Sequence, residues 1–253
     1  MVESALQTFS ENCKDLYFPS TICEVQQVPS PLEFHRRWVC PNVPLIVRGG
    51  ISHWPAVHKW THEYLRDKIG ARTVTVAVTP NGYADAVHDG LFVMPEERRL
   101  PFAKFLDIIE HESDFKGVFY VQKQNSNFTD EFEPLADDVD VDIAWATAAF
   151  AKAPDAVNFW MGDARAVTSM HRDHYENIYC VVKGRKDFIL LPPTDLPWIP
   201  YRNFRTATYR ENRDTGMFEV VPTGSSVRFF HIKRYRGAGS GNAVCCFAVM
   251  LHG

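Results

Sequence analysis

The chain has 253 residues, of which 45% are hydrophobic and 23% charged, a composition that is ordinary for a globular protein. Its formal net charge is −4 and its sequence shows no basic stripe, which argues against a nucleic-acid partner. No apolar segment reaches about 18 residues, so we expect no membrane span and no membrane partner. The length fits one large domain or two small ones.

The cysteines and the N-terminus indicate a reducing compartment. Six cysteines are scattered without a C-x-x-C pair, which argues against a zinc module and against a disulfide framework. The segment MVESALQTFSENCKD has no basic region followed by an apolar run, so we expect no signal peptide. The cytoplasm or the nucleus is the expected location.

The first 100 residues predict helices and strands in mixture. Ser30 followed by Pro31 favours a helix start, and residues 44–49 have the character of a short strand. A helix is expected up to Gly70. Residues 72–79 alternate, which predicts a half-buried strand with one apolar face formed by Val74, Val76 and Val78.

Residues 101–155 predict two helices on either side of a strand. Pro101 precedes apolar residues at helical spacing, namely Phe102, Phe105, Leu106 and Ile109. Residues 117–124 resemble a strand, and residues 142–152 a second helix.

After residue 156 the pattern changes to strands in quick succession, expected at 156–162, 166–171, 176–182 and 186–192. Such short strands predict an antiparallel barrel or sandwich. We expect a mostly β fold with flanking helices, divided into a mixed N-terminal region (1–100), a barrel core (101–219) and a tail (220–253).

The stretch SMHRDHYEN, residues 169–177, concentrates groups that bind metals or protons. A protein kinase loop also begins His-Arg-Asp, but it needs Asn five residues after its Asp, and Asn177 follows Asp173 by four. A zinc peptidase needs His-Glu-x-x-His on a helix, whereas His171 and His174 are three apart in a segment that favours strand.

Two interpretations of this stretch as a metal site remain. On a strand, His171 and Asp173 point to the same side and can share one ion. With a further His they form the two-His-one-carboxylate site of non-haem Fe(II) oxygenases. The alternative is a cupin metal site of another kind, formed by His171, Asp173 and Glu176.

The neighbourhood favours the oxygenase interpretation. Thr168 precedes His171 by three residues, and Lys186 opens the next expected strand. A dicarboxylate that chelates iron at one end needs a cation and hydroxyls at its far carboxylate, and Lys with Thr is a suitable pair. Lys is rarely buried without a partner, although an edge-strand role would also explain Lys186.

With these residues in place, the sequence resembles the jumonji C family of 2-oxoglutarate oxygenases. Within this family it is similar to the animal lysyl hydroxylases to which a peptidase activity is also attributed. The resemblance runs from about residue 30 to about residue 219. It is carried by WVCPNVP, VAVTPNGYADAV, MPEERRLP, YVQKQ, PDAVNFW and AVTSMHRDHYENIYCVVKGRKDF.

The resemblance implies a double-stranded β-helix barrel of cupin type and a set of site residues. His171 and Asp173 would ligate Fe(II), while Tyr120, Thr168, Asn177 and Lys186 would hold 2-oxoglutarate. Contacts with substrate are expected from Tyr83, Asp85 and Trp160.

The same resemblance implies a reaction and partners. O2 and 2-oxoglutarate would be consumed to hydroxylate C3 of a lysine in a developmentally regulated GTP-binding protein. A peptidase activity on histone tails is also attributed to relatives. Because members of the family can be dimeric, the N-terminal helical segment is a candidate interface in a homodimer.

The chain departs from the family beyond residue 219, where no Trp-x-His segment supplies the second iron His. The later histidines, His231 and His252, lack the surroundings of that ligand. We interpret residues 220–253 as a divergent tail from a splice variant, a retained intron or a gene-model error, and we expect an incomplete barrel. A non-catalytic module that binds a protein partner is the alternative function.

Overall fold

The structure is a computed structural model that describes residues 2–17, 21–111, 114–124, 126–199, 201–230 and 244–251, the last range by its backbone. Strands predominate in it and helices flank them, as the sequence predicted. Among the described helices, none has both the length and the apolar character that crossing a membrane requires.

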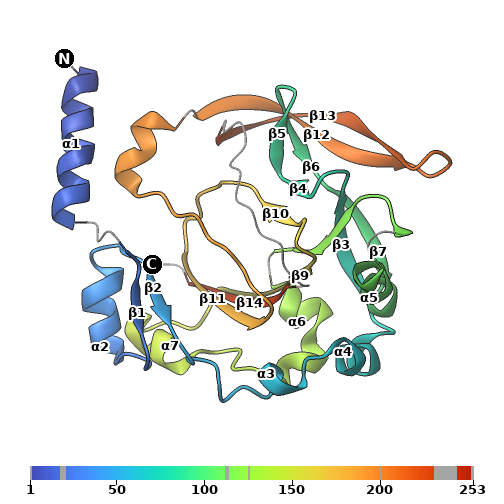
Figure 1. The fold of residues 1–253 in the computed structure, drawn as a ribbon, viewed down its shortest axis with the longest axis horizontal. Helices are drawn as coiled ribbons and strands as arrows, with labels where there is room; N and C mark the ends of the chain where they lie inside the picture. Colours follow the sequence, from blue (N-terminus) through green and yellow to red (C-terminus); the bar gives the residue numbers. More distant parts are fainter. Residues whose placement is uncertain are drawn as a thin grey trace.

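A six-stranded sheet forms the centre of the fold (Figure 1). Every pair of neighbouring strands in it is antiparallel. Its strands, in spatial order, are β11 (Glu176–Lys183), β14 (Val244–Leu251), β9 (Ala156–Gly162), β8 (Val118–Val121), β3 (Thr73–Thr79) and β7 (Glu96–Pro101).

Helices cover the outer face of this sheet, where the main hydrophobic core lies (Figure 1). Alternate strand residues such as Val76, Phe159 and Val182 point into this core, which buries apolar area and thereby stabilises the fold. The covering elements are α3 (Pro55–Lys59), α4 (His62–Ile69), α5 (Phe102–Glu110), α6 (Asn127–Glu131), the 3-10 helix η3 (Glu133–Asp138) and α7 (Ala144–Phe150).

A second sheet of four strands lies at the other end of the molecule (Figure 1). Two short parallel pairs form separate sheets, β1 (Cys23–Val25) with β2 (Leu45–Val47) beside α2 (Pro31–Phe34), and β4 (Tyr83–Ala84) with β10 (Val167–Thr168) (Figure 1). No sheet closes into a barrel within the described ranges. The four strands are, in order, β13 (Met217–Phe230), β12 (Tyr201–Asn212), β6 (Leu91–Met94) and β5 (Ala86–His88).

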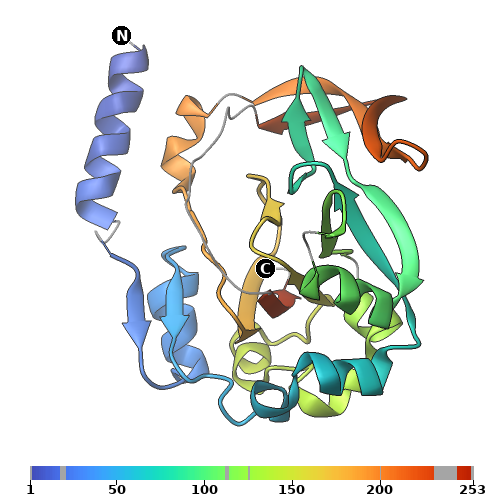
Figure 2. The ribbon, with the colours of Figure 1, turned by 45° about the vertical axis from the view of Figure 1, so that its right-hand side comes forward.

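The N-terminal helix α1 (Val2–Tyr17) stands beside the rest of the fold and packs against the 3-10 helix η4 (Pro193–Trp198) (Figure 2). The expected helix after Ser30 is formed by α2 (Pro31–Phe34) and continues as the π-helix η1 (His35–Val39). The Ser30 hydroxyl accepts a hydrogen bond from the backbone N–H of Glu33, the capping contact that Ser at this position provides. Gly70 caps α4, as predicted.

Three strand predictions are wrong. The strand expected at 166–171 is reduced to β10 (Val167–Thr168). Strand β3 is buried on both faces, because its polar side also faces inward and the Thr75 hydroxyl donates a hydrogen bond to Glu131. Residues 186–192 form no strand, since no other described strand supplies the backbone partners that a ladder requires.

The domain division at residues 100/101 and 219/220 stays a prediction. Strand β13 crosses the second boundary, and its residues pair with β12 along most of their length. Strand β14, which lies farther into the expected tail, pairs with β9 and β11.

Candidate functional site

The inner face of the six-stranded sheet carries several of the predicted site residues. Because strand side chains alternate, Phe119, Phe159 and Cys180 point to the helices while their neighbours point the other way. Tyr120 and Trp160 pack together on this inner face, and Tyr179 packs against them with its ring centroid 5.7 Å from that of Trp160. Side chains from β8, β9 and β11 thus form an aromatic wall opposite the core.

His171 and Asp173 lie close together in the loop between β10 and β11. The distance from His171 Nε2 to Asp173 Oδ2 is 3.4 Å. The prediction that strand alternation brings them together is wrong, because residues 169–175 lie outside any strand. The loop itself places them, since Ser169 O lies 2.8 Å from His171 Nδ1 and the Asn177 amide donates to Asp173 Oδ2 at 3.1 Å.

The electrostatics of this loop follow from its contacts. The hydrogen bond to Asp173 raises the pKa of His171, and the same contact lowers the pKa of Asp173. Burial raises the pKa of Asp85, while the nearby His171 imidazole acts in the opposite direction. Asp85 is also held in the left-handed region at φ 54°, which is uncommon for a residue other than glycine and occurs more often at functional sites.

Lys186 and Tyr120 form a second part of the site. Lys186 Nζ donates to Tyr120 Oη at 3.3 Å and lies 5.4 Å from the centroid of that ring. Lys186 sits in an extended segment that follows Gly184, and its side chain is half-buried. A cation and a phenol hydroxyl thus converge at the aromatic wall.

The structure does not bring every predicted residue into this cluster. Thr168 ends β10 with an exposed side chain, and Asn177 contacts Asp173 rather than Lys186. Tyr83 lies in β4, paired with Val167 of β10. Trp160 is 9% exposed and belongs to the aromatic wall.

Two of the three ligands of an iron site fit a common ion. Metal bonds of about 2 Å to an imidazole nitrogen and a carboxylate oxygen allow those atoms to lie up to about 4 Å apart. The contact to Ser169 O occupies His171 Nδ1 and leaves Nε2 for the metal, the usual arrangement for a ligating His.

A third ligand is missing from the described ranges. Within them no three His, Cys, Asp or Glu side chains gather closely enough to hold a metal. The alternative triad of His171, Asp173 and Glu176 is therefore not formed. His231 and His252 lie outside the described residues.

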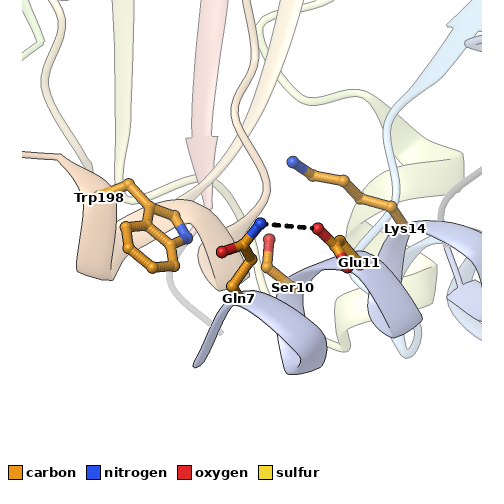
Figure 3. Close-up of a pocket in the computed structure, with 5 residues that line it drawn as sticks. All are labelled: Gln7, Ser10, Glu11, Lys14 and Trp198. Atoms are coloured by element: carbon orange, nitrogen blue, oxygen red, sulfur yellow. Dashed lines mark hydrogen bonds between the residues drawn. The ribbon is translucent and has the colours of Figure 1, made fainter. Parts of the chain in front are cut away.

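Two surface hollows lie away from these residues. One, of about 380 Å³, lies at the junction of α1 and η4 and is bordered by Gln7, Ser10, Glu11, Lys14 and Trp198 (Figure 3). The other, of about 250 Å³, is bordered by Lys123, Gln124, Asn127, Asp130 and Glu131. Neither contains His171 or Lys186, so we place the candidate site by side-chain chemistry rather than by cavity size.

Two residues of the site were not predicted. Tyr179 could have been found, because period-two alternation from Asn177 places it on the same face of β11. The role of the Ser169 carbonyl, by contrast, depends on a loop conformation that the sequence pattern does not encode.

Comparisons with known proteins show which family the chain resembles. The family described as cupin-like domain matches residues 31–240. The human bifunctional peptidase and (3S)-lysyl hydroxylase JMJD7 is 49% identical over 220 residues, which cover 87% of this chain and 69% of the human protein.

Two further relatives are similar over most of this chain. Lysine-specific demethylase JMJ32 of Arabidopsis thaliana is 38% identical over 82% of the chain, and JmjC domain-containing protein E of Dictyostelium discoideum is 35% identical over 79%. The chain covers 61% of the length of each of these two relatives.

Proposed function

The chain belongs to the cupin-like jumonji C family, and from that premise we propose that it is an Fe(II)- and 2-oxoglutarate-dependent hydroxylase of a lysine side chain. Membership confirms the predicted cupin-like fold with flanking helices. The observation that carries the proposal is the 3.4 Å approach of His171 Nε2 to Asp173 Oδ2, in the sequence motif that the resemblance assigned to iron.

Each side chain has a role in this proposal. His171 and Asp173 hold the iron, and Ser169 O with Asn177 fixes their orientation. Lys186 and Tyr120 bind the far carboxylate of 2-oxoglutarate through charge-assisted hydrogen bonds. Bound iron with 2-oxoglutarate supplies the activation of O2 and the oxidation of a C–H bond.

Asp85 places one acidic side chain near His171. This carboxylate is suited to hold the ammonium of a lysine that enters from solvent. Lysine C3 as the position, and a developmentally regulated GTP-binding protein as the substrate, are parts of this proposal that follow the family resemblance. The human relative is named for both a lysyl hydroxylase and a peptidase activity.

A specific observation favours a second function. Within the described ranges only two iron ligands come together, and the segment that carries Lys186 has no strand partner. A cupin-like module that binds a protein partner without turnover would tolerate both features. We therefore expect any iron-dependent turnover of this chain to be weak.

Succinate release from 2-oxoglutarate separates the two functions. The assay compares the unaltered chain with His171→Ala and with His88→Ala, an exposed histidine of β5 that serves as the control. Succinate that forms with Fe(II), persists in His88→Ala and vanishes in His171→Ala supports the oxygenase. The same background level in all three proteins would support the non-catalytic module.

A further inference from the structure

Arginine side chains gather on the β12–β13 hairpin beside the loop that carries His171 and Asp173. In an antiparallel pair, directly opposed residues share a face of the sheet. Arg228 is opposite Asn203, which lies on the same face as Tyr201 and Arg205 because alternate residues do so. Two guanidinium groups and an aromatic ring therefore occupy one face of this hairpin.

A third arginine reaches this face from the candidate iron loop. Arg172, which lies between the two predicted ligands, places its Cζ 5.3 Å from the centroid of the Tyr201 ring. Arg228 Cζ lies 4.8 Å from the same centroid. One tyrosine ring thus holds two guanidiniums together, one of them in the sequence motif of the candidate site.

These three arginines have no acidic partner among the described residues, unlike several other arginines of the fold. Arg98 pairs with Glu96 and Glu211, and Arg165 pairs with Asp163. No carboxylate of the described residues forms an ion pair with Arg172, Arg205 or Arg228, all of which are exposed. Uncompensated like charges at close range repel one another, so a bound anion would stabilise this arrangement.

We propose that Arg172, Arg205 and Arg228 bind acidic side chains of the protein substrate, next to the residue that enters the candidate iron site. The proposal rests on the proposed function, which supplies the protein substrate and the place of reaction. The planar guanidinium group presents paired N–H donors that match a carboxylate. Asp85 and this arginine cluster would then select a lysine with acidic neighbours.

The arrangement favours a peptide over a nucleic acid. Proteins that bind single-stranded nucleic acid offer aromatic faces for base stacking along a positive groove. Here guanidinium groups already lie over the Tyr201 ring, and the cluster is local in a chain of net charge −4.

Binding of matched peptides tests the proposal without iron or co-substrate, so the result is independent of turnover. The probes are two short fluorescein-labelled peptides with a central lysine, one with flanking glutamates and one with glutamines at the same positions. We expect the glutamate peptide to bind about tenfold more tightly at low salt, with a difference that shrinks as salt rises. Fluorescence anisotropy measures both affinities.

Charge reversal identifies the residues responsible. Arg228→Glu and Arg205→Glu should abolish the preference for the glutamate peptide, while Arg228→Lys should keep most of it. Arg213→Glu, at the exposed turn of the same hairpin, is the matched control and should leave the preference unchanged. Thermal unfolding verifies that each variant is folded.

Three outcomes would overturn the proposal. They are equal affinity of the unaltered protein for both peptides, an equal loss in Arg213→Glu and Arg228→Glu, and tighter binding of a single-stranded RNA oligonucleotide than of the glutamate peptide. Failure of the proposed function would instead appear in the succinate assay, even if the acidic peptide binds.

Discussion

The Asp138 carboxylate joins three elements that cover the main core. It is 3% exposed and accepts hydrogen bonds from Tyr64 Oη at 2.6 Å, Trp60 Nε1 at 3.1 Å and Lys59 Nζ at 3.1 Å. Burial alone would raise the pKa of Asp138, but the hydrogen bonds outweigh it and hold the pKa below its ordinary value. The hydrogen bond between Tyr64 and Asp138 raises the pKa of Tyr64 to about 12.

Replacement of Asp138 by alanine should destabilise the fold. The change removes three hydrogen bonds and leaves the buried Trp60 N–H without its acceptor, so we expect the free energy of unfolding at pH 7 to fall by about 3 kcal/mol. Urea titration measures this free energy of unfolding. Asp137→Ala, at the exposed neighbouring position, is the control and should change stability by less than about 0.5 kcal/mol. Equal losses in both variants would contradict this role of Asp138.

The contribution of Asp138 should also depend on pH. A carboxylate whose pKa is lower in the folded state stabilises the fold above its unfolded pKa of about 3.9, and this stabilisation is lost as pH falls through the folded pKa. The difference in stability between the unaltered chain and Asp138→Asn should therefore narrow in acid. A stability difference between the two proteins that stays constant down to pH 3 would contradict this predicted pH dependence.

At the scale of single elements, β8 and β9 pair at a position where the Tyr120 ring requires a small residue on the neighbouring strand. Tyr120 is paired with Gly162, and a Cβ at Gly162 would lie 2.6 Å from Tyr120 Cδ2. Glycine at the end of β9 thus leaves room for the Tyr120 ring, whose hydroxyl contacts Lys186.

Gly162→Ala should displace that ring. Overpacking of this kind costs about 1–3 kcal/mol, and we expect binding of 2-oxoglutarate to weaken along with stability. The double variant Tyr120→Ala with Gly162→Ala tests the cause, because removal of the ring should relieve the clash. Additive losses of unfolding free energy in the double variant would show that the two positions do not interact.

The segment from Phe188 to Leu191 leaves apolar side chains at the surface. Leu190 is 60% exposed, and the segment has no backbone partner among the described strands. Exposed apolar edges promote association between chains. Leu190→Lys should therefore reduce aggregation, measured by light scattering, and shift stability by no more than about 0.5 kcal/mol. Leu190→Ile keeps the apolar surface and should aggregate like the unaltered chain.

This segment also marks the limit of prediction at the scale of elements. Local sequence was enough to predict α5, whose buried residues follow the helical period, and β8, a short apolar run that is buried at all four positions. Residues 186–192 have a strand-like composition, yet a strand exists only where another strand pairs with it. The partner is a property of distant sequence, so the local pattern could not exclude the wrong prediction.

At the scale of the whole molecule, α1 is attached through few polar contacts. Asp195 of η4 accepts a hydrogen bond from Ser10 Oγ at 3.1 Å and pairs with Lys14 Nζ at 3.2 Å. Cys13, which lies on the same helix between Ser10 and Lys14, is 9% exposed, whereas Cys40 is exposed. The accessibility of the Cys13 thiol therefore reports whether α1 is docked.

Asp195→Ala should release α1. Loss of one hydrogen bond and one partly exposed ion pair corresponds to about 1–2 kcal/mol, so alkylation of Cys13 should accelerate by about fivefold or more. Mass spectrometry of the labelled peptides distinguishes Cys13 from Cys40. Asp214→Ala, at an exposed turn, is the control. An unchanged rate for Cys13 in Asp195→Ala would mean that apolar packing alone holds the helix.

Only part of the candidate site could be predicted from the sequence. The reason is the one that limits prediction of the fold, namely that pairings between distant segments are not encoded locally. The His-x-Asp spacing together with Thr168 and Lys186 predicted a site around His171 and Asp173, and the resemblance added Tyr120. The structure brings His171 close to Asp173 and Lys186 into contact with Tyr120. The position of Asp85 near His171 depends on strand β4 lying beside β10, a pairing between distant residues. Periodicity within one segment carries no information about such pairings.

The fluorescence of Trp160 is expected to report binding at the candidate co-substrate site. Its indole packs with Tyr120, whose hydroxyl contacts Lys186, and its ring lies beside Tyr179. A dicarboxylate that draws Lys186 away from Tyr120 would alter the surroundings of the indole. Titration with 2-oxoglutarate should therefore change the tryptophan emission of the unaltered chain, and Trp160→Phe should remove that change, which gives a binding assay independent of metal and oxygen.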